Sequence, residues 1–166
     1  LVPMATTNLF TDPAFKDGAF TSNDPAVRAY AIQKTMRAID LGVECGAKVY
    51  VFWGGREGVE SDATKNPTES TKRFREALNF LCAYTRDQGY DLRFALEYKP
   101  KEPRTHCYMA RMADTLLLAQ ETGCSNVGIT IDTGHAFVAG EVVGESIVLA
   151  KRAGDRLMHM HFNDNY

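Results

Sequence analysis

Two carboxylates and a histidine stand at corresponding places in the sequence, each at the end of a short apolar segment. Glu97 follows Leu92–Leu96, Asp132 comes 35 residues later, and His161 lies a further 29 residues along. Each interval is about one strand-and-helix unit, so we expect the three side chains at one rim of a parallel sheet. Carboxylates and an imidazole suit a divalent metal such as Mn²⁺, Co²⁺ or Mg²⁺. Taken singly, each acid could equally be a loop residue or helix cap, and His161 an ordinary sheet histidine, but the matching positions favour a metal site.

Three further residues near strand ends are suited to catalysis or binding. Lys99 follows Glu97 by two residues and, with the period of a strand, points to the same side, where its ammonium group could polarise a carbonyl or an alkoxide. Its simpler role is that of a salt-bridge partner. His135 follows Asp132 by three residues in a glycine-containing turn, and could bind a second metal or a substrate oxygen, or simply begin a helix. Trp53, the only tryptophan, could form an apolar wall against the carbon face of a sugar or pack in the core.

The elements that would hold these residues alternate between apolar strands and amphipathic helices. Short runs rich in β-branched and aromatic residues predict five strands that are covered on both faces: Val2–Thr6, Val49–Trp53, Leu92–Leu96, Val127–Ile131 and Leu157–Phe162. Apolar stripes, caps and terminal glycines predict four helices between them: Asp24–Gly46, Thr68–Gln88, His106–Thr122 and Glu141–Ala153. This order indicates a parallel sheet with right-handed crossovers.

The predicted fold class is α/β, a partial (β/α)₈ TIM barrel of about five parallel strands that alternate with four helices. A doubly wound sheet has the same order, but no GxGxxG or Walker sequence follows any strand, and polar residues at successive strand ends are typical of a barrel. Residues 1–166 are expected to form a single partial barrel domain. Because the sequence opens on Leu1 inside a predicted strand and stops just after another, we expect an internal piece of a longer protein.

The composition is that of an ordinary globular protein: 166 residues, 45% hydrophobic, 24% charged, with a net charge of −2. This balance gives no basic footprint for nucleic acid, and no apolar run of 18 residues predicts a membrane span. Cys45 and Cys82 lie in predicted helices, where buried thiols are expected, and four widely spaced cysteines without a CxxC pair fit a cytoplasmic setting. Several charged loop residues are expected to be solvated, or to make loop or subunit contacts: Arg56, Glu57, Glu60, Lys101, Glu102 and Arg104.

Four separate motifs resemble, in this order, those of bacterial xylose isomerases: Met4–Phe10, Phe15–Gly18, Trp53–Gly58 and Glu97–Arg104. The resemblance covers most of the chain and implies roughly the third to seventh strands of the barrel. It further implies two divalent metal ions (Mg, Mn or Co), a monosaccharide substrate and a homo-oligomer, commonly a tetramer. The implied reaction is the conversion of D-xylose to D-xylulose, an aldose to a ketose, by a metal-assisted hydride shift from C2 to C1.

The resemblance also implies roles for individual residues. Glu97 matches a ligand of the first metal, Asp132 a carboxylate that bridges both metals, and His135 the histidine of the second, catalytic metal. His161 stands where a further metal ligand is expected. Lys99 matches the lysine that hydrogen-bonds the C1 oxygen, so it joins His135 as a catalytic residue. The expected substrate-binding residues are Trp53, Phe10 and Thr6.

Two positions depart from the xylose isomerase pattern. Xylose isomerases of the usual kind carry Glu where this chain has Asp132, and Asp where it has His161. The Asp and His pair, with the segment His161–Asp164, looks more like L-rhamnose isomerases and ketose 3-epimerases, although Lys99 argues against the epimerases, which use two glutamates to move protons. A metal-dependent DNA-repair endonuclease is a remote alternative that the acidic balance disfavours, and a non-catalytic sugar-binding module is another. Since the metal ligands are incomplete, the isolated segment is expected to be inactive.

Overall fold

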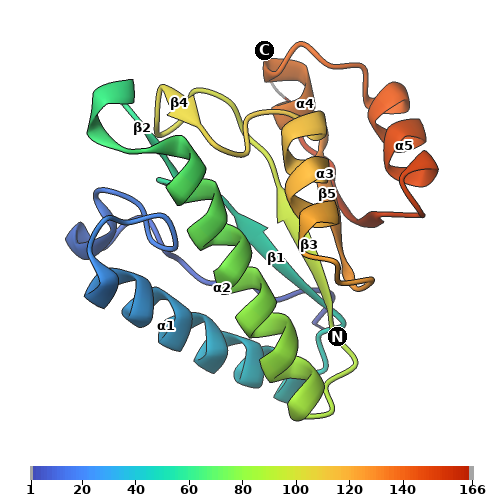
Figure 1. Ribbon diagram of the computed structural model, residues 1–166. Helices are drawn as coiled ribbons and strands as arrows, with labels where there is room; N and C mark the ends of the chain where they lie inside the picture. Colours follow the sequence, from blue (N-terminus) through green and yellow to red (C-terminus); the bar gives the residue numbers. More distant parts are fainter. Residues whose placement is uncertain (1, 165–166) are drawn as a thin grey trace.

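A four-stranded parallel sheet forms the centre of the protein. The computed structural model describes residues 2–164. The strands of the sheet are β1 (Val49–Trp53), β3 (Arg93–Glu97), β5 (Val127–Asp132) and β6 (Leu157–His161), in the order β1-β3-β5-β6. Strands that are neighbours in the sheet are therefore successive β/α units of the chain, as in a barrel. Helices connect the strands and cover one face of the sheet (Figure 1). The prediction of a partial (β/α)₈ barrel is confirmed.

The two long helices begin at the capping residues that the sequence displays. α1 (Pro25–Glu44) follows Asp24, whose carboxylate accepts the N–H of Ala26 at 2.8 Å, and α2 (Pro67–Asp87) follows Asn66. In both, proline occupies the first helical position, where a missing N–H costs nothing. The shorter helices are α3 (Met112–Glu121), α4 (Thr133–Val138) and α5 (Val143–Arg152), with 3₁₀ turns η1 (Pro13–Phe15) and η2 (Asp62–Thr64). Over residues 2–164, every helix is too short or too polar to cross a bilayer.

Alternate side chains of the strands serve the two faces of the sheet. Tyr50 and Phe52 of β1 are buried in the main core, which the helices cover. Val51 of β1 and Ala95 of β3 belong to a second, smaller apolar cluster. Because strand side chains alternate, Glu97 lies on the same face as Ala95. The face that the helices leave open therefore carries the first of the predicted metal ligands.

The prediction of a strand over Val2–Thr6 is wrong, because this segment forms no regular strand. Within it only Ala5 pairs, with Tyr50, as an isolated parallel bridge held by backbone hydrogen bonds of 2.8 and 2.9 Å. Beyond this bridge, the hydroxyl of Thr6 donates to the carbonyl of Val51 at 2.9 Å. That carbonyl is the acceptor that the next backbone N–H of a parallel pair would need. The segment still lies beside β1, on the side away from β3, where the preceding barrel strand belongs.

The helix predicted over His106–Thr122 is wrong in its first part, since α3 begins only at Met112. His106–Cys107 form β4, which pairs antiparallel with β2 (Gly58–Val59). Gly58 makes this pairing possible, because a Cβ there would lie 2.2 Å from a backbone oxygen of the partner strand. The sequence also predicts only a turn where α4 forms, because six residues are too few to show a helical period.

Candidate metal centre and adjoining pocket

Glu97, Asp132 and His161 meet at the carboxyl ends of three strands. Each is the last residue of its strand, and Asp132 is paired with His161 in the register of β5 and β6. One ligand atom from each residue lies within 4.8 Å of those of the other two. Glu97 is 6% exposed and Asp132 is 4% exposed, and two buried negative charges side by side are unfavourable without a compensating cation. The structure thus brings together the trio that the sequence predicts.

His135 joins the trio from the first turn of α4. Its Nδ1 lies 3.2 Å from Oε1 of Glu97, and Nδ1 of His161 lies 3.2 Å from the same oxygen. The contact of His135 lacks hydrogen-bond geometry, so its buried Nδ1 has no hydrogen-bond partner among residues 2–164. An unpaired buried nitrogen and two acceptor-only carboxylates fit a divalent cation that accepts both nitrogen and oxygen ligands. Glu97, Asp132 and His161 would hold such an ion, and His135 lies beside them.

Asp132 is oriented by two groups. Its Oδ1 accepts the backbone N–H of His135 at 2.9 Å, which makes Asp132 the N-cap of α4. The amide Nδ2 of Asn163 lies 2.7 Å from Oδ1 and 2.6 Å from Oδ2 of the same carboxylate. Asn163 is itself fixed by Thr133, whose hydroxyl donates to the Asn163 carbonyl at 2.7 Å. The sequence does not predict Asn163 as a site residue. The signal that could have indicated it is its position two residues after His161.

Lys99 lies beside the candidate metal centre but is held by an ion pair. Its ammonium nitrogen is 2.7 Å from Oε2 of Glu102 and 5.7 Å from the centre of the Trp53 ring. The hydrogen bond from Lys99 lowers the pKa of the Glu102 carboxyl below its ordinary value. Since Glu102 is largely exposed and Lys99 is not, the pair can separate at little cost when another oxygen competes for the ammonium group.

A hollow of about 460 Å³ opens beside the metal-ligand cluster. Phe10 and Trp53 form one wall in an edge-to-face pair, with ring centres 4.6 Å apart. The lining includes all three residues predicted to bind substrate, together with the predicted catalytic pair and two candidate ligands: Met4, Thr6, Thr7, Asn8, Phe10, Val51, Trp53, Glu97, Lys99, His135 and His161. One side of the hollow is therefore apolar and aromatic, and the other is charged.

The charged loop residues are more ordered than the sequence predicts. Glu57 is 4% exposed, so of the two expected roles solvation is wrong and a loop contact is confirmed. Its carboxylate accepts backbone N–H groups of Phe20 at 2.7 Å and Thr21 at 3.1 Å, and it fastens that loop to the end of β1. Burial raises the pKa of Glu57, and these hydrogen bonds oppose the effect. Arg56 donates from Nε to the carbonyl of Phe10 at 2.9 Å.

The fold and the cluster define a (β/α) barrel protein with a candidate metal centre at the carboxyl ends of its strands. The chain belongs to the family described as xylose isomerase-like TIM barrel, whose profile matches residues 2–166. A xylose isomerase of Thermus thermophilus is 48% identical over 164 residues. The match covers 98% of this chain and 42% of that relative, so the chain spans about two fifths of the relative's length.

Solved structures of similar fold include two that differ strongly in sequence. A D-tagatose 3-epimerase-like protein superposes with a TM-score of 0.78 at 20% identity, and covers 98% of this chain and 56% of its own. A protein described as IOLI with a bound zinc atom gives a TM-score of 0.69 at 19% identity, over 87% of this chain and 48% of its own. These similarities establish the barrel fold of the segment.

Proposed function

We propose that this segment carries the metal centre and the carbonyl-polarising lysine of a sugar isomerase that interconverts an aldose and a ketose. The observation that carries the proposal is that Lys99 lines the same hollow as Glu97, His135 and His161. The 48% identity to a relative named xylose isomerase supports D-xylose and D-xylulose as the sugar pair.

The side chains around the hollow have separate tasks in such a reaction. When bound, a divalent metal supplies a Lewis acid that polarises the oxygens on C1 and C2. Glu97 and Asp132 would balance the charge of that metal, and His161 would complete the near side of its site. Lys99 donates a hydrogen bond to the C1 oxygen and stabilises negative charge there as hydrogen passes from C2 to C1. Trp53 and Phe10 offer apolar surface to the sugar and keep water from the migrating hydrogen.

A second metal ion would be held by His135, which is not part of the close trio. The trio of Glu97, Asp132 and His161 has mutually close ligand atoms and is sufficient for the near side of one site. His135 reaches the same Glu97 oxygen from α4 and would face a second ion. Two divalent ions, Mg, Mn or Co, are therefore part of the proposal, as the resemblance implies.

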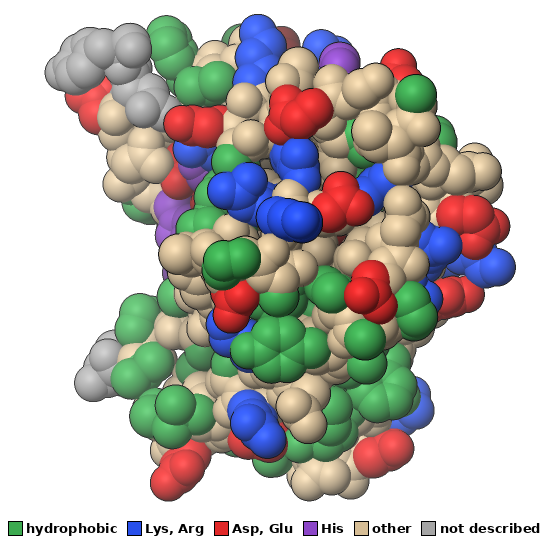
Figure 2. Space-filling model, turned by 90° about the vertical axis from the view of Figure 1, so that its left-hand side faces the viewer, with side chains coloured by type: hydrophobic (Ala, Val, Ile, Leu, Met, Phe, Trp, Pro, Cys, Tyr) green, Lys and Arg blue, Asp and Glu red, His purple; other side chains and the backbone are tan. Residues whose placement is uncertain are grey.

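A ketose 3-epimerase or an L-rhamnose isomerase-type enzyme is the second candidate. The pairing of Asp132 with His161 favours it, because xylose isomerases of the usual kind carry Glu and Asp at these positions. One protein of similar fold is described as D-tagatose 3-epimerase-like, which also supports this second candidate. A nuclease is not proposed: on the face shown in Figure 2, Lys and Arg side chains of the described residues are interspersed with Asp and Glu, without a basic stripe for a phosphate backbone.

The deciding experiment is sugar turnover by the complete protein in D₂O, with Mn²⁺, Co²⁺ or Mg²⁺ and each of D-xylose, L-rhamnose and D-fructose. A hydride shift yields the ketose from an aldose with little deuterium in the product, because the hydrogen never leaves the sugar. Proton transfer by a 3-epimerase inserts deuterium at C3 of a ketose. Exclusive C3 exchange would replace the isomerase proposal by the epimerase, and no turnover of any sugar would refute both.

A further inference from the structure

Phe10 is fixed by other side chains although it lies in a segment without regular secondary structure. The side-chain oxygen of Asn8 accepts the N–H of Phe10 at 3.0 Å and that of Thr11 at 2.9 Å. From the other side, Nε of Arg56 donates to the Phe10 carbonyl at 2.9 Å. Both backbone polar groups of Phe10 are thus bonded to side chains, which restricts the backbone position of a residue whose ring lines the hollow.

The loop after β1 supplies both the second ring of the wall and the group that holds the first. Trp53 ends β1, and its ring meets that of Phe10 edge to face at 4.6 Å. Arg56 follows three residues later. Between them, Gly55 has a φ of +52°, and a Cβ there would lie 3.0 Å from Cβ of Phe10. A close approach at Gly55 and a charge-assisted hydrogen bond at Arg56 therefore clamp Phe10 against Trp53.

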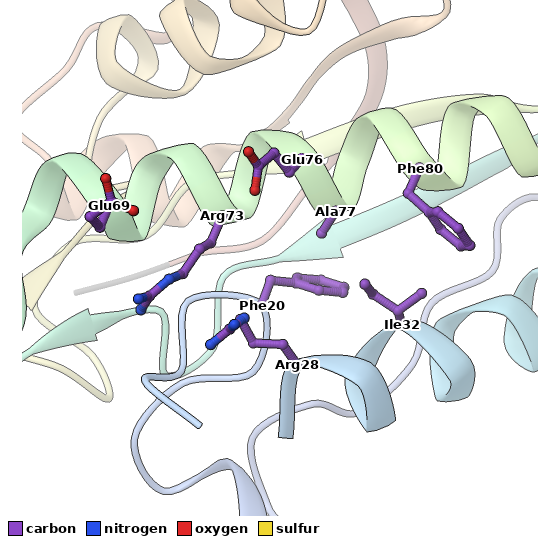
Figure 3. A pocket seen from close by; sticks show the side chains of 8 residues that line it. All are labelled: Phe20, Arg28, Ile32, Glu69, Arg73, Glu76, Ala77 and Phe80. Carbon is purple, nitrogen blue, oxygen red and sulfur yellow. The ribbon is translucent and has the colours of Figure 1, made fainter. Parts of the chain in front are cut away.

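Two other arginines tie a loop to the long helices, but away from the candidate metal centre. In the hollow of about 420 Å³ between α1 and α2, Arg28 and Arg73 both donate to the carbonyl of Ser22, at 2.8 and 3.4 Å (Figure 3). Ser22 is not among the residues that line the hollow beside the candidate metal centre. Arg56 differs because the residue that it holds supplies a wall of that hollow.

We propose that Arg56 is a positioning residue for the apolar wall of the sugar pocket and that it acts through Phe10. The expected effect on KM rests on the proposed function. An aromatic wall that packs on the carbon face of a sugar contributes equally to binding in the ground state and in the transition state. Loss of the guanidinium should therefore weaken sugar binding, with the chemical step little changed. Arg56 itself touches no reacting atom.

The test compares Arg56→Met, which keeps the aliphatic stem and removes the guanidinium, with Arg37→Met at an exposed site on α1. Each is made in the complete protein, alone and together with Phe10→Ala. KM and kcat are measured for the sugar that is turned over. In parallel, the fluorine-19 resonance of fluorotryptophan-labelled protein is assigned to Trp53 by a Trp53→Phe variant. Arg56→Lys, which keeps the charge and lacks Nε, is the second variant should Arg56→Met fail to fold.

Arg56→Met is expected to raise KM about three- to tenfold, the size of one ordinary hydrogen bond, because the ring is loosened and not removed, while kcat stays within about twofold. In the Phe10→Ala background the same change should add nothing, because the ring that Arg56 positions is gone. The Trp53 resonance should move or broaden in Arg56→Met and stay in place in Arg37→Met. An equal rise of KM in both backgrounds, or an unmoved Trp53 resonance, would overturn the inference. If no sugar is turned over, the proposed function fails, and the Trp53 resonance still decides whether Arg56 positions the wall.

Discussion

Nδ1 of His161 lies 3.2 Å from Oε1 of Glu97, although the two residues are 64 positions apart in the chain. Their strands, β6 and β3, are not neighbours, because β5 runs between them. Strands two apart in a sheet are separated by about 10 Å, so the contact requires both side chains to lean over the end of β5. Asp132, the last residue of β5, lies under that contact with its Oδ2 4.0 Å from Nδ1 of His161. Three strands thus converge on one point, as a metal centre requires.

Replacing Glu97 by Gln should weaken binding of Mn²⁺ by at least about tenfold, because the amide keeps the shape of the side chain but removes a charge that both histidines approach. Isothermal titration calorimetry of the complete protein measures this affinity. Glu76→Gln, at an exposed site on α2, is the matched control and should bind Mn²⁺ like the unaltered protein. Equal affinities of the Glu97 and Glu76 variants would contradict the assignment of Glu97 as a ligand.

Lys99→Met should lower kcat for aldose–ketose conversion by roughly two to three orders of magnitude, the usual effect of removing one group that stabilises a developing oxyanion. Affinity for Mn²⁺ should be unchanged, since Lys99 contacts Glu102 and the Trp53 ring rather than the carboxylates of the candidate metal centre. Lys72→Met, on the exposed side of α2, is the control. Sugar turnover that survives in the Lys99 variant would show that the mechanism does not use the lysine.

The sheet order and the convergence of Glu97, Asp132 and His161 could be predicted from sequence because both depend on local patterns. Apolar runs mark the buried parallel strands, and a ligand that directly follows such a run must lie at the sheet's carboxyl edge. Long-range pairing is different. The bridge that Ala5 makes with Tyr50 joins two segments that lie far apart in the chain. The burial of Glu57 depends on a loop 36 to 38 residues away, which no local pattern reveals.

The positions of Asn163 and Arg56 show a second limit of sequence reasoning. Each is a polar residue in a polar segment, and its type alone does not distinguish a solvated side chain from one that orients a neighbour. Asn163 reaches Asp132 across 31 residues, and Arg56 reaches Phe10 across 46. Residues that support a site from behind become visible only when the folded chain places donor and acceptor together.

Asn163→Ala should weaken Mn²⁺ binding about 10- to 100-fold, the effect of removing a group that orients a metal-binding carboxylate. The amide lies within 2.7 Å of both oxygens of Asp132, so without it the carboxylate can rotate away from the other ligands. The change should leave the free energy of unfolding nearly unaltered, because Asn163 is exposed. Calorimetry measures the affinity and urea titration the stability. Unaltered affinity in the Ala variant would show that the cap of α4 alone is sufficient to orient Asp132.

The ion pair of Lys99 and Glu102 should persist well into the acid range. The hydrogen bond from Lys99 lowers the pKa of Glu102 below its ordinary 4.5, so the folded protein binds this proton less readily than the unfolded chain. The stabilising effect is therefore complete above about pH 4.5 and is lost as the pH falls through the lowered pKa. Carbon-13 NMR of the Glu102 carboxyl should give a midpoint below 4.5, and Lys99→Met should raise it. An unchanged midpoint in that variant would exclude the ion pair in solution.

Gly128→Ala should destabilise the fold, because β5 and β6 approach each other closely at this residue. A Cβ at Gly128 would lie 2.2 Å from the backbone oxygen of Arg156, which itself accepts the N–H of Ile129 at 2.7 Å. A backbone atom cannot move aside without breaking this hydrogen bond, so a loss of about 1–3 kcal/mol in the free energy of unfolding is expected.

Gly144→Ala in α5 is the matched control, since nothing lies within 4 Å of its Cβ position. There the same substitution should be neutral or stabilise by up to about 1 kcal/mol, as alanine replaces glycine in a helix. Urea titration of both variants measures the difference, and a Gly128 variant as stable as the Gly144 variant would show that β6 is not paired with β5 in this register.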